Sequence, residues 1–473
     1  MPGMLFFGGL LAVQLVEGTD PVFTVLMMLA QIFAVMAFNT LGGFSHVAGS
    51  FCLFSVLPNV TVPEIAHALV LQPGDFNLLE PLRTAGVCAV YYASFYAAAR
   101  FVVSLPAPRP YLDRVKFTVV ELRAISIIAV LGVVGISVWG TLAGGVKENG
   151  SALAAVAHFY PALNSLSVVV ATYVRLQSTQ GRSAMNWYVA LILGVTTLPG
   201  ILFASKEGML TPLFCWMVVC AISGYQFTRT QAAALAGAML FAWFYVYPFS
   251  QNARVAVRAA ESTSDRIAVI EHYFTDPSDF PNEAETIDPD FAEYGESSAK
   301  LRIIQRFSLL ASCGMLVNAD QVEGFTGVER YLPALVMIVP HFIWLDRPIP
   351  ITSNELGHKA GFRIARSDTS TGIAIASPAL FYDLGGWLAL PVYAILGFGI
   401  FFYGLRCMVG DARGESVWGL MLIGSTALLA GGISPAGLID YLENFVMVFA
   451  VLLVTLKALT YLSETMFAQP IAQ

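Results

Sequence analysis

Charged residues are scarce in this chain of 473 residues: they make up 12% of it, whereas 57% is hydrophobic. Soluble domains carry about 25% charged residues, so the composition excludes a water-soluble protein. The mean hydropathy of +0.69 instead predicts a polytopic membrane protein. We expect it to be all α-helical, because backbone inside a bilayer must satisfy its own hydrogen bonds and the strand alternation of a transmembrane barrel is missing.

Other signals are also missing from the sequence. The N-terminus lacks the basic region of a cleavable signal peptide, so we expect the first span to act as the insertion signal. No internal repeat of the kind found in many transporters is visible. The cysteines show neither metal-ligand spacing nor a pattern of pairs, and we interpret them as packing residues: Cys52, Cys88, Cys215, Cys220, Cys313 and Cys407. The cysteines thus offer no cluster of metal ligands, and we expect no cofactor and no nucleic-acid partner.

Apolar runs long enough to cross a bilayer dominate the chain, since a span needs about 20 residues. They predict about twelve transmembrane helices (range 10–13), near 3–16, 22–40, 44–58, 84–104, 124–144, 152–174, 186–203, 207–226, 231–248, 384–404, 417–433 and 438–460. This divides the chain into an N-terminal bundle (1–248), one large loop (249–383) and C-terminal helices (384–473). The run 331–345 is too short to span and is expected to be re-entrant or interfacial.

Basic residues in the short loops predict the orientation. The loop 105–123 carries four of them, so the positive-inside rule places it in the cytoplasm: Arg109, Arg114, Lys116 and Arg123. Counting spans from there places both termini in the cytoplasm and the insert 249–383 on the extracytoplasmic side of the cytoplasmic membrane.

The insert divides by charge. Residues 259–299 carry eleven acidic side chains against one basic, Arg266, and are expected to be solvated and partly irregular. Residues 300–366 carry eight basic side chains against five acidic ones. The apolar spacing over Ala299–Leu316 predicts a helix lying in the outer interface, with Arg302 and Arg306 together on one flank.

Three short stretches resemble the Wzy-type O-antigen and exopolysaccharide repeat-unit polymerases. In Val339–Pro348, four residues match the family pattern I-P-R-x-[IL]-W-P-x-[KR]-P, while His341 replaces the arginine and Leu345 the second proline: Pro340, Trp344, Arg347 and Pro348. Ala204–Gly208 resembles the family's short Ser-[RK] motif. Ser377–Gly386 resembles its P-x-x-E-x-Y-x-x-[FL]-G-x-x-G run, with Asp383 standing only near the usual glutamate position.

The resemblance implies transfer of a growing glycan from a polyprenyl pyrophosphate onto a hydroxyl of an incoming lipid-linked repeat unit, without a metal. Such chemistry needs fixed cations for the diphosphate, a base for the hydroxyl and aromatic rings for sugars. The predicted catalytic residues are Arg347, His341, Glu355 and Asp346. The predicted substrate-binding residues are Lys206, Arg302, Arg306, Arg330, Arg363, Arg366, Trp344 and Tyr382.

Two other functions stay open at this point. A lipid-to-acceptor glycan ligase would use similar outer-face chemistry, and a lipid-linked glycan transporter or flippase would need charges along several spans. Expected partners are the polyprenyl-pyrophosphate-linked glycan and membrane lipid, together with a chain-length regulator and a flippase.

Overall fold

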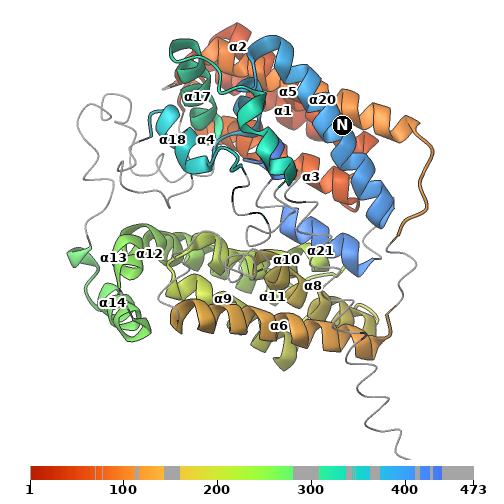
Figure 1. The fold of residues 1–473 in the computed structure, drawn as a ribbon, viewed down its shortest axis with the longest axis vertical. Coiled ribbons are helices and arrows are strands. Elements are labelled where there is room, and N and C mark those ends of the chain that lie inside the picture. Colours follow the sequence, from red (N-terminus) through yellow and green to blue (C-terminus); the bar gives the residue numbers. More distant parts are fainter. Residues whose placement is uncertain are drawn as a thin grey trace, which may run out of the picture.

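The computed structural model describes residues 2–69, 71–76, 78–111, 117–142, 160–260, 262–280, 308–336, 344, 346, 348–362, 373–410, 416–426, 430–438, 441 and 457. All regular elements within these residues are helical. The helices form two groups, one of α1–α5 with α17–α20 and one of α6–α14, and α21 lies between them (Figure 1).

The first group contains the N-terminal helices and the long helix that follows the insert. Its members are α1 (Pro2–Val16), α2 (Pro21–Thr40), α3 (Val47–Val56), the π-helix η1 (Leu57–Thr61), α4 (Val62–Leu69), α5 (Pro81–Ser104) and α20 (Gly386–Val409). Helix α5 packs against both α2 and α20. Their interface is a buried aromatic cluster, in which the rings of Phe95 and Phe398 lie 4.4 Å apart.

The second group contains α6 (Val119–Leu142), α8 (Tyr160–Ser178), α9 (Trp187–Leu202), α10 (Lys206–Ile222), α11 (Arg229–Phe241), η3 (Ala242–Val246) and α12 (Tyr247–Asn252). Helix α8 packs on α6, α9 and α10. Helix α21 (Val417–Thr426) contacts α8 and α10 on one side and α3 on the other, so it joins the two groups.

The insert supplies the remaining short helices. They are α13 (Arg254–Ala259), α14 (Thr263–Thr275), η4 (Pro277–Asp279), α17 (Leu310–Val322), η5 (Val328–Arg330), η6 (Leu332–Val336), α18 (Ser353–Lys359) and α19 (Ser377–Tyr382). A capping box between Ser262 and Asp265 starts α14, so this part of the acidic half is helical where we expected partly irregular structure.

Six helical segments among the described residues are long and apolar enough to cross a membrane: Pro21–Thr40, Val47–Leu69, Pro81–Ser104, Val119–Val138, Arg229–Ser250 and Gly386–Val409. Two further apolar helices, Trp187–Leu202 and Gly208–Ile222, are shorter. An α-helical membrane protein is thus confirmed, whereas the number of twelve spans stays a prediction.

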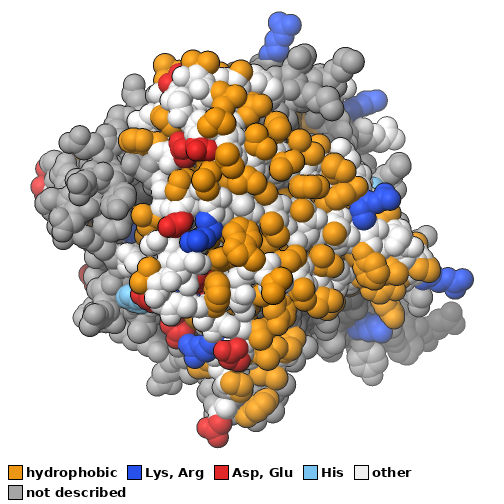
Figure 2. Space-filling view, turned by 90° about the horizontal axis from the view of Figure 1, so that it is seen from above, with side chains coloured by type: hydrophobic (Ala, Val, Ile, Leu, Met, Phe, Trp, Pro, Cys, Tyr) orange, Lys and Arg blue, Asp and Glu red, His pale blue; other side chains and the backbone are white. Residues whose placement is uncertain are grey.

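A broad apolar face covers the outside of this helical body, with charged side chains toward its edges (Figure 2). On α20 the exposed apolar side chains recur at helical spacing: Leu388, Val392, Leu396, Ile400 and Tyr403. Such a stripe on the outside of a bundle is the expected surface for lipid tails.

The third span is longer than the sequence predicted. We expected it to end at Pro58, but the helix continues to Leu69 through the π-helical turn η1. The wider turn accommodates the proline, which lacks an N–H, and the Nδ2 of Asn59 donates to the Ser55 carbonyl oxygen at 2.8 Å.

The helix predicted over Ala299–Leu316 lies in part outside the described residues. Within them, helix α17 begins at Leu310, after the non-helical Ser308 and Leu309. Most of its side chains are buried against α5 and α19. The described part of the predicted segment therefore packs against other helices of the body, whereas the interfacial position of its arginines stays a prediction.

Loops predicted on opposite sides of the membrane lie at opposite ends of the fold. The segment after α5 meets the end of α20, where the Tyr111 N–H donates to the Cys407 carbonyl oxygen at 3.0 Å. Helices α13, α14 and α18 of the insert lie at the other end (Figure 1). The compartment that each end faces stays a prediction.

Candidate functional site

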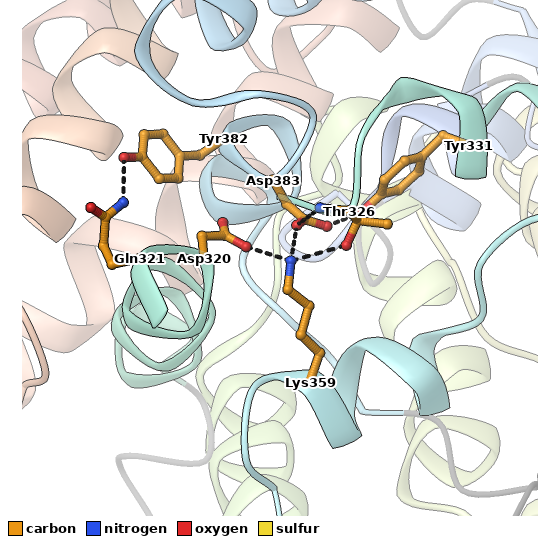
Figure 3. A network of polar contacts seen from close by, with 7 residues as sticks. All are labelled: Asp320, Gln321, Thr326, Tyr331, Lys359, Tyr382 and Asp383. Carbon is orange, nitrogen blue, oxygen red and sulfur yellow. Dashed lines mark hydrogen bonds and ion pairs between the residues drawn. The ribbon is translucent and has the colours of Figure 1, made fainter. Parts of the chain in front are cut away.

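A buried lysine joins three helices of the insert. Lys359, the last residue of α18, donates to Asp320 of α17 at 2.6 Å and to Asp383 at the end of α19 at 2.5 Å (Figure 3). Both carboxylates are fully buried, and the lysine side chain is 14% exposed. Three segments far apart in the sequence therefore meet at one charged contact.

Two neutral groups complete the shell around Asp383. The Thr326 N–H donates to its Oδ1 at 2.9 Å, and the Tyr331 hydroxyl donates to its Oδ2 at 2.8 Å. Lys359 donates a third hydrogen bond, to the Thr326 hydroxyl at 3.0 Å. Both oxygens of the Asp383 carboxylate thus accept hydrogen bonds. Asp320 Oδ2, in contrast, is buried and lacks a hydrogen-bond partner within the described part of the chain.

The two carboxyl groups differ in how readily they ionise. Burial raises the pKa of Asp320 to about 8, and the neighbouring Asp383 adds to the rise. Burial also acts to raise the pKa of Asp383, but the neighbouring Asp320 and the ammonium group of Lys359 outweigh it and hold the pKa below its usual range. Burial lowers the pKa of Lys359, yet the two carboxyl groups outweigh burial and raise it. At neutral pH the cluster is best described as an ion pair of Lys359 with Asp383 beside a protonated Asp320.

This arrangement predicts a pH dependence of stability. An unfolded aspartate ionises near pH 4, whereas Asp320 holds its proton in the fold up to about pH 8. The folded state therefore binds more protons in this window, and the free energy of unfolding decreases as the pH rises, by up to about 1.4 kcal/mol per unit. Thermal unfolding of purified protein between pH 5 and 8 should show this slope, and Asp320→Asn should remove it. An equal slope in both proteins would contradict the assignment.

A second, exposed pair joins η5 to α18. The Arg330 guanidinium donates to the Glu355 carboxylate at 2.9 Å, with side chains 53% and 50% exposed. Both residues are in the predicted site, one as a phosphate-binding cation and one as a base. The Ile351 N–H also donates to the Arg330 carbonyl oxygen at 3.0 Å, which joins the two backbone segments.

Each residue of the exposed pair is linked through the chain to a residue of the buried cluster. Arg330 directly precedes Tyr331, whose hydroxyl is bonded to Asp383. Glu355 lies one helical turn before Lys359 on α18, and Thr352 caps that helix by accepting from the Glu355 N–H at 3.1 Å. The cluster therefore fixes where the cation and the carboxylate stand.

Other predicted residues lie in different settings. Trp344 and Asp346 are exposed. The Tyr382 side chain is 1% exposed, its ring packs on Phe325 and Trp387, and its hydroxyl accepts from Gln321 at 3.1 Å. Tyr382 therefore offers no free ring face to a sugar and packs as a core residue, because the insert folds over it.

Lys206 begins α10 in a tight turn from α9. Ser205 caps the helix by accepting from the Gly208 N–H at 3.2 Å. Gly200 and Gly208 touch so closely that a Cβ on Gly200 would lie 2.4 Å from the Gly208 carbonyl carbon. This turn lies beside α14 of the insert, where the Arg266 guanidinium stands 4.8 Å from the Phe203 ring centre.

Six predicted site residues lie outside the described residues: His341, Arg347, Arg302, Arg306, Arg363 and Arg366. Among the described residues, no group of three or more His, Cys, Asp or Glu side chains could hold a metal ion.

The buried charges Asp320, Lys359 and Asp383 were not among the predicted site residues. One signal was present, since Asp320 lies within the apolar run Leu310–Val322 and a buried charge needs a partner. The sequence did not identify that partner.

No family model, curated protein or solved structure matches the chain.

Proposed function

We propose that this chain is a membrane glycosyltransferase that polymerises polyprenyl-pyrophosphate-linked oligosaccharide repeat units at the outer face of the cytoplasmic membrane. The observation that carries the proposal is the exposed Arg330–Glu355 pair, anchored by the Lys359 cluster at one end of the helices. Its chemistry meets the two demands of the reaction, a cation for the diphosphate and a base for the hydroxyl.

In the proposed reaction, the acceptor hydroxyl oxygen forms a bond to the anomeric carbon of the donor glycan. The bond from that carbon to the lipid diphosphate breaks, and the diphosphate leaves with the electron pair. Arg330 suits the leaving group because a guanidinium binds phosphate oxygens in a fork and stays charged. Glu355 suits the acceptor because a carboxylate released from Arg330 takes up the hydroxyl proton.

The buried cluster supports this role by holding both groups still. Arg330 and Glu355 belong to short helical segments, which have little stability of their own. Lys359 and Tyr331, bonded to the same Asp383 carboxylate, tie these segments to α19 and so to the long helix α20. With their backbone segments fixed in this way, only the two side chains must separate for the cation and the base to act.

A deletion strain tests the function. We expect surface glycan of a single repeat unit in place of the ladder of chain lengths, with recovery when the wild-type gene is restored. Full-length polymer that stays on its lipid carrier would instead support a ligase. Lipid-linked repeats that accumulate on the cytoplasmic side would support a flippase. Either of these results would overturn the proposal.

A further inference from the structure

A small polar cavity lies among the N-terminal helices, apart from the site described above. It has a volume of about 20 Å³ and is lined by α1, α2 and α4 through Leu11, Gln14, Thr24, Met28, Gln31 and Glu64. A cavity of this size holds one water molecule or one small ion. Its lining combines polar with apolar side chains and contains a single ionisable one, Glu64.

Around the cavity, Thr24 and Gln14 donate hydrogen bonds to main-chain oxygens. Their own side-chain oxygens can therefore still accept. The Thr24 hydroxyl donates to the Asp20 carbonyl oxygen at 2.9 Å. The Gln14 Nε2 donates to the main-chain oxygen of Glu64 at 3.1 Å, and its Oε1 accepts from Thr19 at 2.8 Å. The Thr24 and Gln14 oxygens keep unused lone pairs.

Gln31 also lines the cavity. Its Oε1 accepts from the Thr61 hydroxyl of η1 at 3.0 Å, which fixes the orientation of the amide. Thr61 and Gln31 are both buried, so this contact is shielded from water. The lining thus combines one carboxylate with three neutral polar side chains.

The Glu64 carboxylate has no basic partner in the described part of the chain. Its side chain makes no recorded ion pair there. It lies in the apolar segment Val47–Leu69, five residues before the end. The other ionisable groups nearby in sequence, His67 and Asp75, do not line the cavity. Glu64 is partly buried. A partly buried carboxylate in an apolar span is stabilised by a bound proton or cation where no basic side chain neutralises it.

We propose that Glu64, with the oxygens of Gln14 and Thr24, binds a small monovalent cation, either a sodium ion or a proton. One carboxylate balances one positive charge, whereas calcium takes six to eight oxygen ligands and usually several carboxylates. The loop that follows α4 reaches the insert, since a Cβ on Gly314 of α17 would lie 2.8 Å from the Leu79 carbonyl oxygen.

The test uses the full-length purified chain in lipid nanodiscs. Sodium chloride replaces choline chloride at constant ionic strength, because choline is too large for the cavity. For a sodium site, we expect the Tm of the wild type to rise with the logarithm of the sodium concentration. Glu64→Gln should abolish this rise, and Thr24→Val should shift it to roughly tenfold higher sodium or more. Glu17→Gln, on a carboxylate outside the lining, serves as the control.

For a proton site, sodium should have no effect. The infrared spectrum of the wild type should then show the C=O band of a protonated carboxylic acid, and Glu64→Gln should remove that band while Glu17→Gln keeps it. If Glu64→Gln does not fold, Thr24→Val takes its place. A weakened sodium response in Thr24→Val then supports the sodium site, and a shifted carboxylic-acid band in Thr24→Val supports the proton site. A wild type with neither a sodium response nor a band that depends on these residues overturns the proposal.

Discussion

Replacing Lys359 with methionine is expected to destabilise the fold by about 3–5 kcal/mol, because it leaves a buried carboxylate without its counter-charge. Asp383 is fully buried and accepts directly from the lysine ammonium. Methionine retains most of the side-chain volume, so the loss reflects charge and hydrogen bonding more than packing. Chemical unfolding in detergent, followed by a helical signal, measures the change.

The matched control is Arg330→Ala, which breaks an ion pair of similar length. Because both side chains of that pair are about half exposed, its contribution to stability is at most about 1 kcal/mol. The triple variant in which Lys359→Met is combined with Asp320→Asn and Asp383→Asn should recover part of the loss, since no buried charge is left. If Lys359→Met were as stable as Arg330→Ala, the cluster would not hold the insert together.

Glu355→Gln is expected to lower the rate of glycan polymerisation by about 10²-fold or more, because an amide cannot accept the hydroxyl proton. Arg330→Ala should lower it by a similar factor through loss of the cation that faces the diphosphate. Arg330→Lys should fall between these variants and the wild type, since it keeps the charge but loses the planar fork. These three predictions rest on the proposed function, and the rate of polymer formation from purified lipid-linked oligosaccharide measures them.

The unfolding temperature separates these effects from a loss of structure. We expect it to stay close to the wild-type value in Glu355→Gln, because the pair is on the surface. Glu323→Gln, on an exposed carboxylate at the end of α17, is the control and should polymerise at the wild-type rate. A wild-type rate in Glu355→Gln would exclude this residue as the base.

The membrane character of the chain was predictable, because it depends on local composition. The apolar runs that predicted spans near 22–40, 84–104 and 384–404 correspond to α2, α5 and α20 within a few residues. The span predicted to end at Pro58 is longer in the structure and continues to Leu69. A proline usually ends a helix, and only the neighbouring helices decide whether a π-turn takes it up.

For the site, the sequence indicated the insert and the types of residue, but not their arrangement. Arg330 and Glu355 were both predicted, yet their contact spans 25 residues of chain. It forms where the segment before α18 meets η5, as the hydrogen bond from the Ile351 N–H to the Arg330 carbonyl oxygen shows. Tyr382 shows the opposite outcome: an aromatic residue predicted to bind sugar is buried because the insert folds over it.

The sequence by itself determined that this protein is built of apolar helices with its charge concentrated in one insert. Only the tertiary structure decided that Lys359 stands between Asp320 and Asp383, residues 39 and 24 positions away. Hydropathy and helical spacing are local properties, and they act over a few turns of chain. Which buried charges meet depends on how α17, α18 and α19 pack together, and no local pattern encodes that choice.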